Sequence, residues 1–257
     1  MAEQTVLVTG GSSDIGRALI ARLCQRAGCP LILAHYFKGA DSIREIPVPE
    51  SVTGRIVPIQ ADLREPASVS EMARRILVDY GAPRHIVHLP AARLRYERFQ
   101  KIDAQRLHED LAIQVDSIVT LLQAFLPELR RPPSPESPAG GVNARIVFVL
   151  SSVTLGLPPK YLTSYSVVKH ALLGLMRAVA VEYGGAGIHI NAVSPSMVET
   201  QFLREIPAIA IEMAAGAHPL KRNGTVNDVC GAIEFLLSGD ADYINGVNLP
   251  LTGGLAV

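Results

Sequence analysis

The chain of 257 residues lacks tryptophan, has only three cysteines and contains few aromatic residues, 5% in all. It has no excess of either charge, because 24 basic residues balance 24 acidic residues. A balanced charge predicts no nucleic-acid partner and no attraction to an anionic membrane. The longest uncharged stretches, such as 146–159, contain serine and proline and fall short of a membrane span. The first residues do not resemble a signal peptide.

The three cysteines, Cys24, Cys29 and Cys230, show neither metal-ligand nor redox spacing. A small, odd number of cysteines indicates reduced thiols, and we therefore expect a cytoplasmic protein. The seven histidines are scattered, without a pair at the spacing of a metal site such as HExxH. We therefore expect no bound metal.

What the sequence does contain is a regular alternation of short β-branched runs with longer helical patterns. Alternation of this kind indicates an α/β fold in a single domain, with parallel strands and helices on both faces of the sheet. Ligands of such sheets bind at the carboxyl ends of the strands. Pro127 is expected to end the third helix, and the proline-rich stretch 131–141 is expected to be a surface insertion. Strands are predicted at 5–9, 31–36, 55–60, 85–89, 145–150, 189–194 and 245–249, and helices at 15–27, 66–80, 103–129, 164–183 and 225–238.

The first predicted strand ends in a glycine-rich turn, Thr9–Gly16 (TGGSSDIG), which leads into the first helix. Glycine lets the backbone approach a pyrophosphate closely, and the N–H groups at the start of the helix bind anions. The alternative is an ordinary turn in which Ser13 or Asp14 caps the helix. The Asp14 carboxylate would repel a pyrophosphate unless it points away.

A second group of residues predicts carbonyl chemistry. Tyr165 and Lys169 are four residues apart in a predicted helix and share one face, while Ser152 follows the fifth predicted strand. A tyrosine can protonate the oxygen of a carbonyl that accepts a hydride, but its ordinary pKa near 10 is high. A nearby ammonium lowers that pKa, and a serine hydroxyl can hold the oxygen. The alternative is a chance Tyr-x-x-x-Lys on an amphipathic helix.

In combination, these motifs resemble the short-chain dehydrogenase/reductase family over essentially the whole chain, and its 3-oxoacyl-(acyl-carrier-protein) reductase branch in particular. Further matching segments are Asp62 in Ala-Asp-Leu, Asn191–Pro195 (NAVSP) with Thr200 downstream, Pro219-Leu220 through Gly246, and the final Thr252–Gly254. The resemblance implies a Rossmann-type, doubly wound parallel sheet in the strand order 3-2-1-4-5-6-7. It also implies a homo-oligomer, either a tetramer or a dimer.

The resemblance assigns catalysis to Ser152, Tyr165 and Lys169, with Gln114 in the place of the helix asparagine that supports a proton relay. Other departures are Asp14 and Ser196 in place of glycines, and Leu89-Pro90-Ala91-Ala92 in place of NNAG; they leave the triad intact. The residues it assigns to cofactor binding are Gly10, Ser12, Ser13, Asp14, Ile15, Gly16, His35, Tyr36, Lys38, Asp62, Leu63, Leu89, Ala91, Tyr165, Lys169, Pro195, Val198 and Thr200.

The second strand ends in His35–Lys38, without an acidic residue to bind a ribose 2′-hydroxyl. Lys38, with His35 and Arg17, offers positive charge to a 2′-phosphate. We therefore predict NADP(H) rather than NAD(H) as the cofactor, although Lys38 could instead be a solvated loop residue.

The apolar stretch at about 196–222 is expected to be a substrate lid, with a packing helix or a subunit contact as alternatives. The sequence thus predicts reduction of a ketone to a secondary alcohol, on a small-molecule or carrier-bound carbonyl compound such as a 3-oxoacyl thioester. A secondary-alcohol dehydrogenase and a non-catalytic NADP-binding subunit remain the alternatives.

Overall fold

The computed structural model describes residues 5–25, 28–91, 93–130, 144–204 and 206–255. Its strands form one parallel sheet in the order β3-β2-β1-β4-β5-β6-β7, which confirms the predicted order. The strands are β1 (Thr5–Thr9), β2 (Leu31–Tyr36), β3 (Ile56–Gln60), β4 (His85–His88), β5 (Ala144–Val149), β6 (Ile188–Pro195) and β7 (Asn248–Leu251). The insertion expected at 131–141 and the end of the first helix at Ala27 lie outside the described residues.

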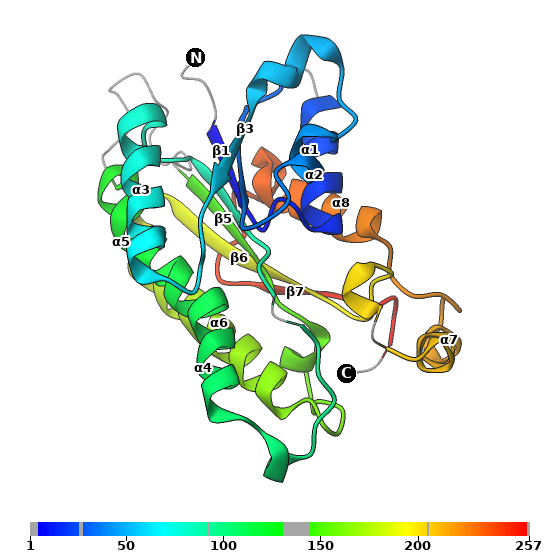
Figure 1. Cartoon of the computed structure of the whole chain (residues 1–257). Helices are drawn as coiled ribbons and strands as arrows, with labels where there is room; N and C mark the ends of the chain where they lie inside the picture. The colour runs from blue at the N-terminus through cyan, green and yellow to red at the C-terminus, as the bar shows by residue number, and fades with distance from the viewer. Residues whose placement is uncertain (1–4, 26–27, 92, 131–143, 205, 256–257) are drawn as a thin grey trace.

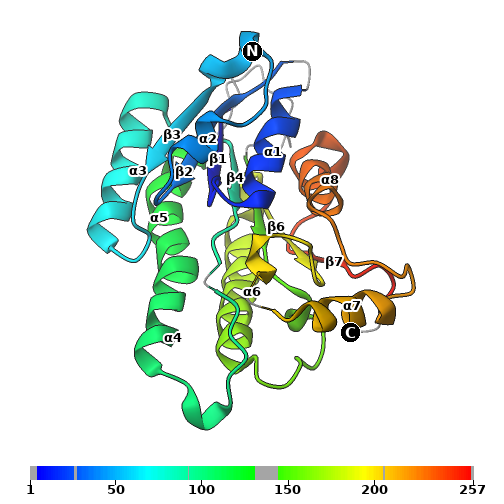
Figure 2. The same ribbon diagram turned by 45° about the vertical axis from the view of Figure 1, so that its right-hand side comes forward.

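Helices cover both faces of this sheet, as Figures 1 and 2 show. On one side α1 packs with α8, and on the other α3, α5 and α6 lie together. The helices are α1 (Asp14–Gln25), α2 (Asp41–Arg44), α3 (Pro66–Tyr80), α4 (Ala104–Leu111), α5 (Ser117–Leu129), α6 (Thr163–Tyr183), α7 (Ala208–Ala217) and α8 (Val226–Leu237).

The two faces of the sheet explain why its strands are apolar without alternation. In β1, Leu7 belongs to the core under α3 and α5, while Val6 and Val8 belong to the core under α1 and α8. Since successive side chains of a strand point to opposite faces, both sets must be apolar when both faces are covered. The sheet is therefore fixed by burial on two sides.

The helix predicted at 103–129 is real but not uniform. It begins at Ala104, widens into a π-helical turn at Ala112–Asp116 and continues as α5. Pro127 lies inside α5, so the prediction that it ends the helix is wrong. A proline removes one N–H and would break an isolated helix, but Leu126 and Leu129 on either side of it are buried in the core, and their packing carries the helix past Pro127.

The same helical stretch, Ala104–Leu129, is long and apolar enough to cross a membrane by length and composition alone. No such segment was expected from the sequence. Its apolar residues Ile118, Leu121 and Phe125 are completely buried against the rest of the chain. Core helices meet the same criteria, and this one is part of the core.

The last strand is β7, which is shifted from the predicted 245–249 because Asn245 and Gly246 form the turn before it. The Asn245 side chain accepts a hydrogen bond from the Ile190 amide and donates one to the Ala180 carbonyl. Gly246 has a φ of 75°, which side chains rarely adopt. These contacts fix the turn, so the ladder with β6 starts only at Asn248.

Three buried histidines make the stability of this fold depend on pH. Burial lowers the pKa of His35 and of His85 to about 4, and that of His88 to about 3. Each imidazole is neutral in the folded chain, whereas in the unfolded chain it gains a proton below its ordinary pKa of 6.5. The stabilisation is therefore complete above pH 6.5 and is lost as the pH falls towards 4.

We predict that the free energy of unfolding drops by on the order of 2 kcal/mol per histidine between pH 7.5 and pH 5. Urea titrations at several pH values measure this drop. His85→Gln should reduce the drop, whereas His108→Gln, at an exposed position, should not. An unfolding free energy that stays constant over this range would contradict the assignment.

Candidate active site

A continuous cavity of about 940 Å³ lies along the carboxyl ends of the strands. One end is lined by Arg17, Tyr36 and Asp62, and the other reaches Tyr165 and Lys169 on α6. Its position follows from the strand order, because the chain turns in opposite directions after β1 and after β4, which lie side by side. The cavity is thus an elongated site at the switch point of the sheet.

The glycine-rich turn forms one wall of this cavity. Gly10 has a φ of 73°, and a Cβ atom on Gly16 would come within 2.6 Å of the Gly10 carbonyl oxygen. The Ser13 hydroxyl donates to that carbonyl and accepts from the Gly16 amide, so Ser13 caps α1. The turn both caps its helix and presents first-turn N–H groups to the cavity, as an anion site requires.

His35 lines the cavity, but both of its ring nitrogens hold the glycine turn and its surroundings. Its Nδ1 accepts a hydrogen bond from the Gly10 amide at 3.0 Å, and its Nε2 lies 3.1 Å from the Ala61 carbonyl oxygen. An acceptor on Nδ1 and a carbonyl at Nε2 require the neutral tautomer with the proton on Nε2. Both nitrogens are occupied, so the prediction that His35 contributes charge to a 2′-phosphate is wrong.

The other basic residues near this end are arranged differently from the prediction. Lys38 does not line the cavity; it is exposed, and its ammonium lies 5.1 Å from the centre of the Phe37 ring. Arg64 lies 5.0 Å from the same ring centre and makes two hydrogen bonds to the Asp62 carboxylate, at 2.9 and 2.5 Å. This pairing lowers the pKa of the Asp62 carboxyl, and the carboxylate offsets the positive charge of the Arg64 guanidinium. Arg17 lines the cavity, and its buried Nε has no acceptor among the described residues.

At the other end, Tyr165 and Lys169 lie one turn apart on α6, as predicted. The Lys169 ammonium is buried, donates a 3.0 Å hydrogen bond to the Val149 carbonyl at the end of β5 and lies 5.7 Å from the centre of the Tyr165 ring. Ser151 also lines the cavity, and its hydroxyl lies close enough to Tyr165 to lower the pKa of the phenol. Ser152 lines the same cavity and begins a short 3-10 turn.

Burial, more than mutual attraction, governs the protonation of this pair. Burial raises the pKa of Tyr165 to about 12, partly opposed by the nearby Ser151 hydroxyl. Burial also lowers the pKa of Lys169 to about 7. The expectation that the lysine lowers the tyrosine pKa is therefore not met in this structure, and near neutral pH the phenol keeps its proton while the lysine is only partly charged.

Gln114 lies outside the cavity wall, in the π-helical turn. Its side-chain Oε1 is buried without a partner among the described residues. Its backbone carbonyl accepts a 2.9 Å hydrogen bond from Nε2 of His88, whose Nδ1 meets the Thr9 hydroxyl at 2.8 Å. A chain of buried hydrogen bonds therefore links the end of β1 to the turn that carries Gln114.

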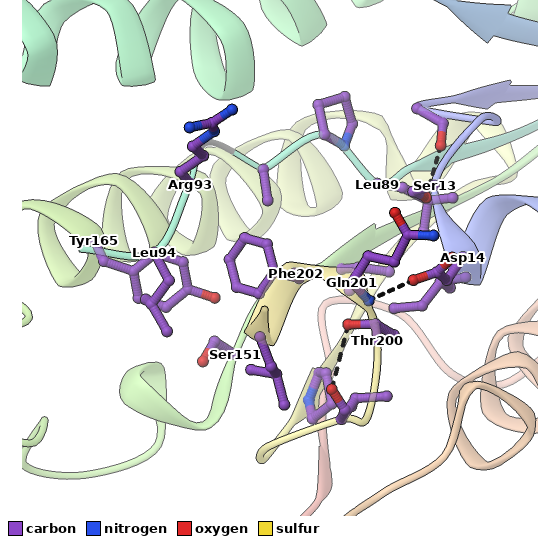
Figure 3. A pocket seen from close by; sticks show the side chains of 18 of the residues that line it. Ser13, Asp14, Leu89, Arg93, Leu94, Ser151, Tyr165, Thr200, Gln201 and Phe202 are labelled. Carbon is purple, nitrogen blue, oxygen red and sulfur yellow. Dashed lines mark hydrogen bonds between the residues drawn. The ribbon is translucent and has the colours of Figure 1, made fainter. Parts of the chain in front are cut away.

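The segment after β6 forms the remaining wall (Figure 3). Phe202 lies against Tyr165, with 6.4 Å between the ring centres, and the Thr200 hydroxyl donates to the Val198 carbonyl. Of the residues predicted from the sequence, Gly16, Lys38 and Gln114 do not line the cavity. Those that do are Gly10, Ser12, Ser13, Asp14, Ile15, His35, Tyr36, Asp62, Leu63, Leu89, Ala91, Ser152, Tyr165, Lys169, Pro195, Val198 and Thr200.

Sequence reasoning did not name Ser151 or Arg64, whereas Phe202 falls in the stretch 196–222 that was expected to be a substrate lid. For Ser151 an available indication was the register of β5: the chain leaves the sheet after Val149, and Ser151 is the first serine to follow. The family resemblance assigned catalysis to Ser152, which lines the same cavity. For Arg64 the sequence offered no pattern.

A family model described as enoyl-(acyl carrier protein) reductase matches residues 10–256. The chain belongs to the short-chain dehydrogenase/reductase family. Membership makes it an oxidoreductase and accounts for the glycine turn and the Tyr165–Lys169 pair at the two ends of one cavity. Like other members, it builds its site at the carboxyl edge of the sheet.

Several relatives match over nearly the whole chain at low identity. An NADPH-dependent aldehyde reductase-like chloroplast protein of Arabidopsis thaliana is 28% identical, over 99% of this chain and 94% of the relative. A 3-oxoacyl-(acyl-carrier-protein) reductase of Pseudomonas aeruginosa is 27% identical, over 98% and 97%. A gluconate 5-dehydrogenase of Burkholderia cenocepacia, solved with NADP and tartrate, has a TM-score of 0.83 at 22% identity, covering 100% of this chain and 97% of that one.

We predict that Ser151→Ala lowers kcat by about 100-fold, because it removes the hydroxyl that lowers the pKa of Tyr165. Ser152→Ala is the comparison variant, because Ser152 lines the same cavity and the family resemblance assigns catalysis to it; a loss within about threefold would favour Ser151. Steady-state kinetics with a substrate of the parent enzyme measure both. A larger loss in the Ser152 variant would return the catalytic role to that residue.

A second prediction concerns pH. Since the pKa of Lys169 is about 7, its ammonium is present below pH 7 and is lost above it. If this charge stabilises the phenolate that forms when Tyr165 gives up its proton, the rate of carbonyl reduction falls as the pH rises through 7. The kcat for reduction, followed from pH 5.5 to 9, tests this; a flat profile would contradict it.

Proposed function

We propose that the protein reduces a ketone to a secondary alcohol with NADP(H) as the hydride donor. The observation that carries the proposal is the meeting of the Tyr165 and Ser151 hydroxyls and the Lys169 ammonium at one end of a cavity whose other end is a glycine turn. The donor set fits a dinucleotide: helix N–H groups for a pyrophosphate, and a reacting end that offers a proton.

Each of the three residues has a distinct role in this proposal. The Tyr165 hydroxyl, protonated at neutral pH because burial raises its pKa to about 12, gives its proton to the carbonyl oxygen. The Ser151 hydroxyl donates a hydrogen bond to the same oxygen and orients the substrate. Lys169 offsets the charge left on the phenolate. The bound nicotinamide supplies the hydride.

A phenol that holds its proton favours reduction, whereas oxidation of an alcohol needs the phenolate as a base. The reductase direction is therefore preferred over the secondary-alcohol dehydrogenase. A non-catalytic NADP-binding subunit would have no need for a buried lysine beneath a tyrosine that faces a cavity, and the intact group opposes that alternative.

The choice of NADP(H) over NAD(H) rests on charge at the far end of the cavity. No carboxylate stands at the end of β2, where one would bind a ribose 2′-hydroxyl. Arg17 replaces Lys38 as the first candidate for a 2′-phosphate, because it lines the cavity and the Asp62 carboxylate neutralises Arg64. The relative described as NADPH-dependent and the NADP-bound structures of similar fold support this choice.

The substrate is proposed to be hydrophobic next to its ketone. Leu94, Leu162, Phe202 and Leu255 line the cavity, and an apolar wall suits an acyl chain better than a sugar. Relatives that act on 3-oxoacyl or 3-hydroxyacyl thioesters make such a thioester the first compound to test. We also propose that residues 196–222 cover the substrate and that the chain forms a homo-oligomer.

The experiment that tests this function follows NADPH and NADH oxidation with a panel of 3-oxoacyl thioesters and simple ketones. We expect turnover with NADPH, and Tyr165→Phe should lower kcat about 1000-fold while nucleotide binding persists. Near-parent turnover in the Tyr165 variant would exclude it as the proton donor. NADPH binding without turnover on any substrate would favour the non-catalytic subunit.

Cofactor choice has its own test. Arg17→Ala should weaken NADPH binding roughly tenfold and leave NADH binding nearly unchanged, since one charge-assisted contact to a phosphate is lost. Lys38→Ala is the control and should have a smaller effect on NADPH. Dissociation constants from nucleotide fluorescence decide between them, and equal losses for NADPH and NADH would refute a 2′-phosphate role for Arg17.

A further inference from the structure

Asp14, which stands in the glycine turn where the family has a glycine, makes a contact across the cavity. Its carboxylate accepts a 2.6 Å hydrogen bond from the backbone N–H of Gln201, in the segment after β6 (Figure 3). Asp14 does not cap α1, because Ser13 already does. Its carboxylate instead caps a different element, the turn that begins at Gln201.

The contact fixes the part of the segment that reaches the reacting end. Gln201 begins the short 3-10 turn Gln201–Leu203, and the first N–H groups of a helical turn have no acceptor within it. Phe202, the next residue, packs on Tyr165. A bond at Gln201 therefore restrains the Phe202 ring over the proton donor.

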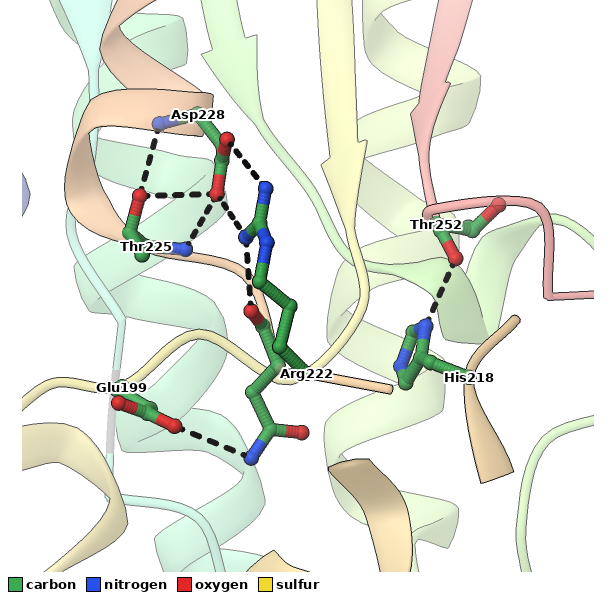
Figure 4. Close-up of polar contacts among 7 residues, drawn as sticks. Glu199, His218, Arg222, Thr225, Asp228 and Thr252 are labelled. Atoms are coloured by element: carbon green, nitrogen blue, oxygen red, sulfur yellow. Dashed lines mark hydrogen bonds and ion pairs between the residues drawn. The ribbon is translucent and has the colours of Figure 1, made fainter. Parts of the chain in front are cut away.

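The far end of the same segment is anchored by contacts of its own. Figure 4 shows Arg222 bound to the Asp228 carboxylate at 2.6 and 3.1 Å, and Asp228 in a capping box with Thr225 at the start of α8. His218 Nδ1 lies 2.9 Å from the Thr252 carbonyl oxygen. Just before Gln201, the Glu199 amide donates to the Gly224 carbonyl and the Gly224 amide donates to the Met197 carbonyl. Asp14 holds Gln201 itself from the opposite wall.

We infer that Asp14 is a positioning residue that holds the segment after β6 closed against the glycine turn and thereby keeps Phe202 over Tyr165. A hydrogen bond to an ionised acceptor is stronger than one between neutral groups, which suits a contact between two partly exposed segments. Asparagine at this position would keep an acceptor and remove the charge, whereas alanine would remove both.

The Asp14 carboxylate would also repel an anionic cofactor, and this second part of the inference rests on the proposed function. Asp14 lines the cavity beside the N–H groups that would bind a pyrophosphate, and two negative charges at close range repel each other. We expect Asp14→Asn to bind NADPH more tightly than the parent protein, because repulsion is relieved while the contact to Gln201 persists.

Hydrogen exchange of the Gln201 amide in the nucleotide-free protein tests the contact directly. Asp14→Ala should speed exchange at Gln201 roughly tenfold, the change expected for loss of a hydrogen bond to a charged group. Asp14→Asn should stay closer to the parent rate. Asp41→Ala, which removes another exposed carboxylate of this half of the chain, is the control. Unchanged exchange at Gln201 in the alanine variant would overturn the inference.

Kinetics and binding then separate positioning from simple structural support. Asp14→Ala should raise the substrate KM severalfold more than it lowers kcat, with rescue by asparagine, because Phe202 loses its place while Ser151, Tyr165 and Lys169 are untouched. An equal loss in both variants would overturn the positioning role. If the parent protein bound no NADPH but Gln201 protection still required Asp14, the proposed function would fail and the contact would stand.

Discussion

The parallel direction of the strands is the constraint on which the rest of the structure depends. It brings the carboxyl ends of β1, β4, β5 and β6 to one edge, so residues from distant parts of the sequence meet there. Parallel strands in turn require crossover helices, which bury both faces. Both faces of the sheet must therefore be apolar, while the edge at the carboxyl ends of the strands can carry polar groups.

Polar groups at that edge are held by other buried polar groups. His35, on β2, links the Gly10 amide of the glycine turn to the Ala61 carbonyl that follows β3. His88 joins the end of β1 to the π-helical turn through two hydrogen bonds. Burial keeps both imidazoles neutral, so each can donate on one nitrogen and accept on the other. Histidine here gives rigidity, and the charge for ligands comes from arginine and lysine.

The charged groups at the site affect both ligand binding and the position of the segment after β6. Burial lowers the pKa of Lys169 to about 7 and raises that of Tyr165 to about 12, so near neutral pH the phenol is protonated and the lysine is partly charged. Asp14 adds a negative charge at the opposite end, where it bonds to Gln201 and not to a cation. In the proposed function, this carboxylate weakens the attraction for an anionic cofactor while it orders the wall over the reacting end.

The sequence by itself determined the α/β alternation, the glycine turn, the Tyr165–Lys169 pair and, through family resemblance, the strand order. The first three of these features depend on the local spacing of residues, which is visible in the sequence before the fold is known. Only the tertiary structure decided that Ser151 joins Ser152 in the cavity wall, that His35 binds backbone groups through both ring nitrogens, and that α5 runs through Pro127. Each of these depends on a partner distant in the chain, and the direction of a side chain after a strand is set by packing that no local pattern encodes.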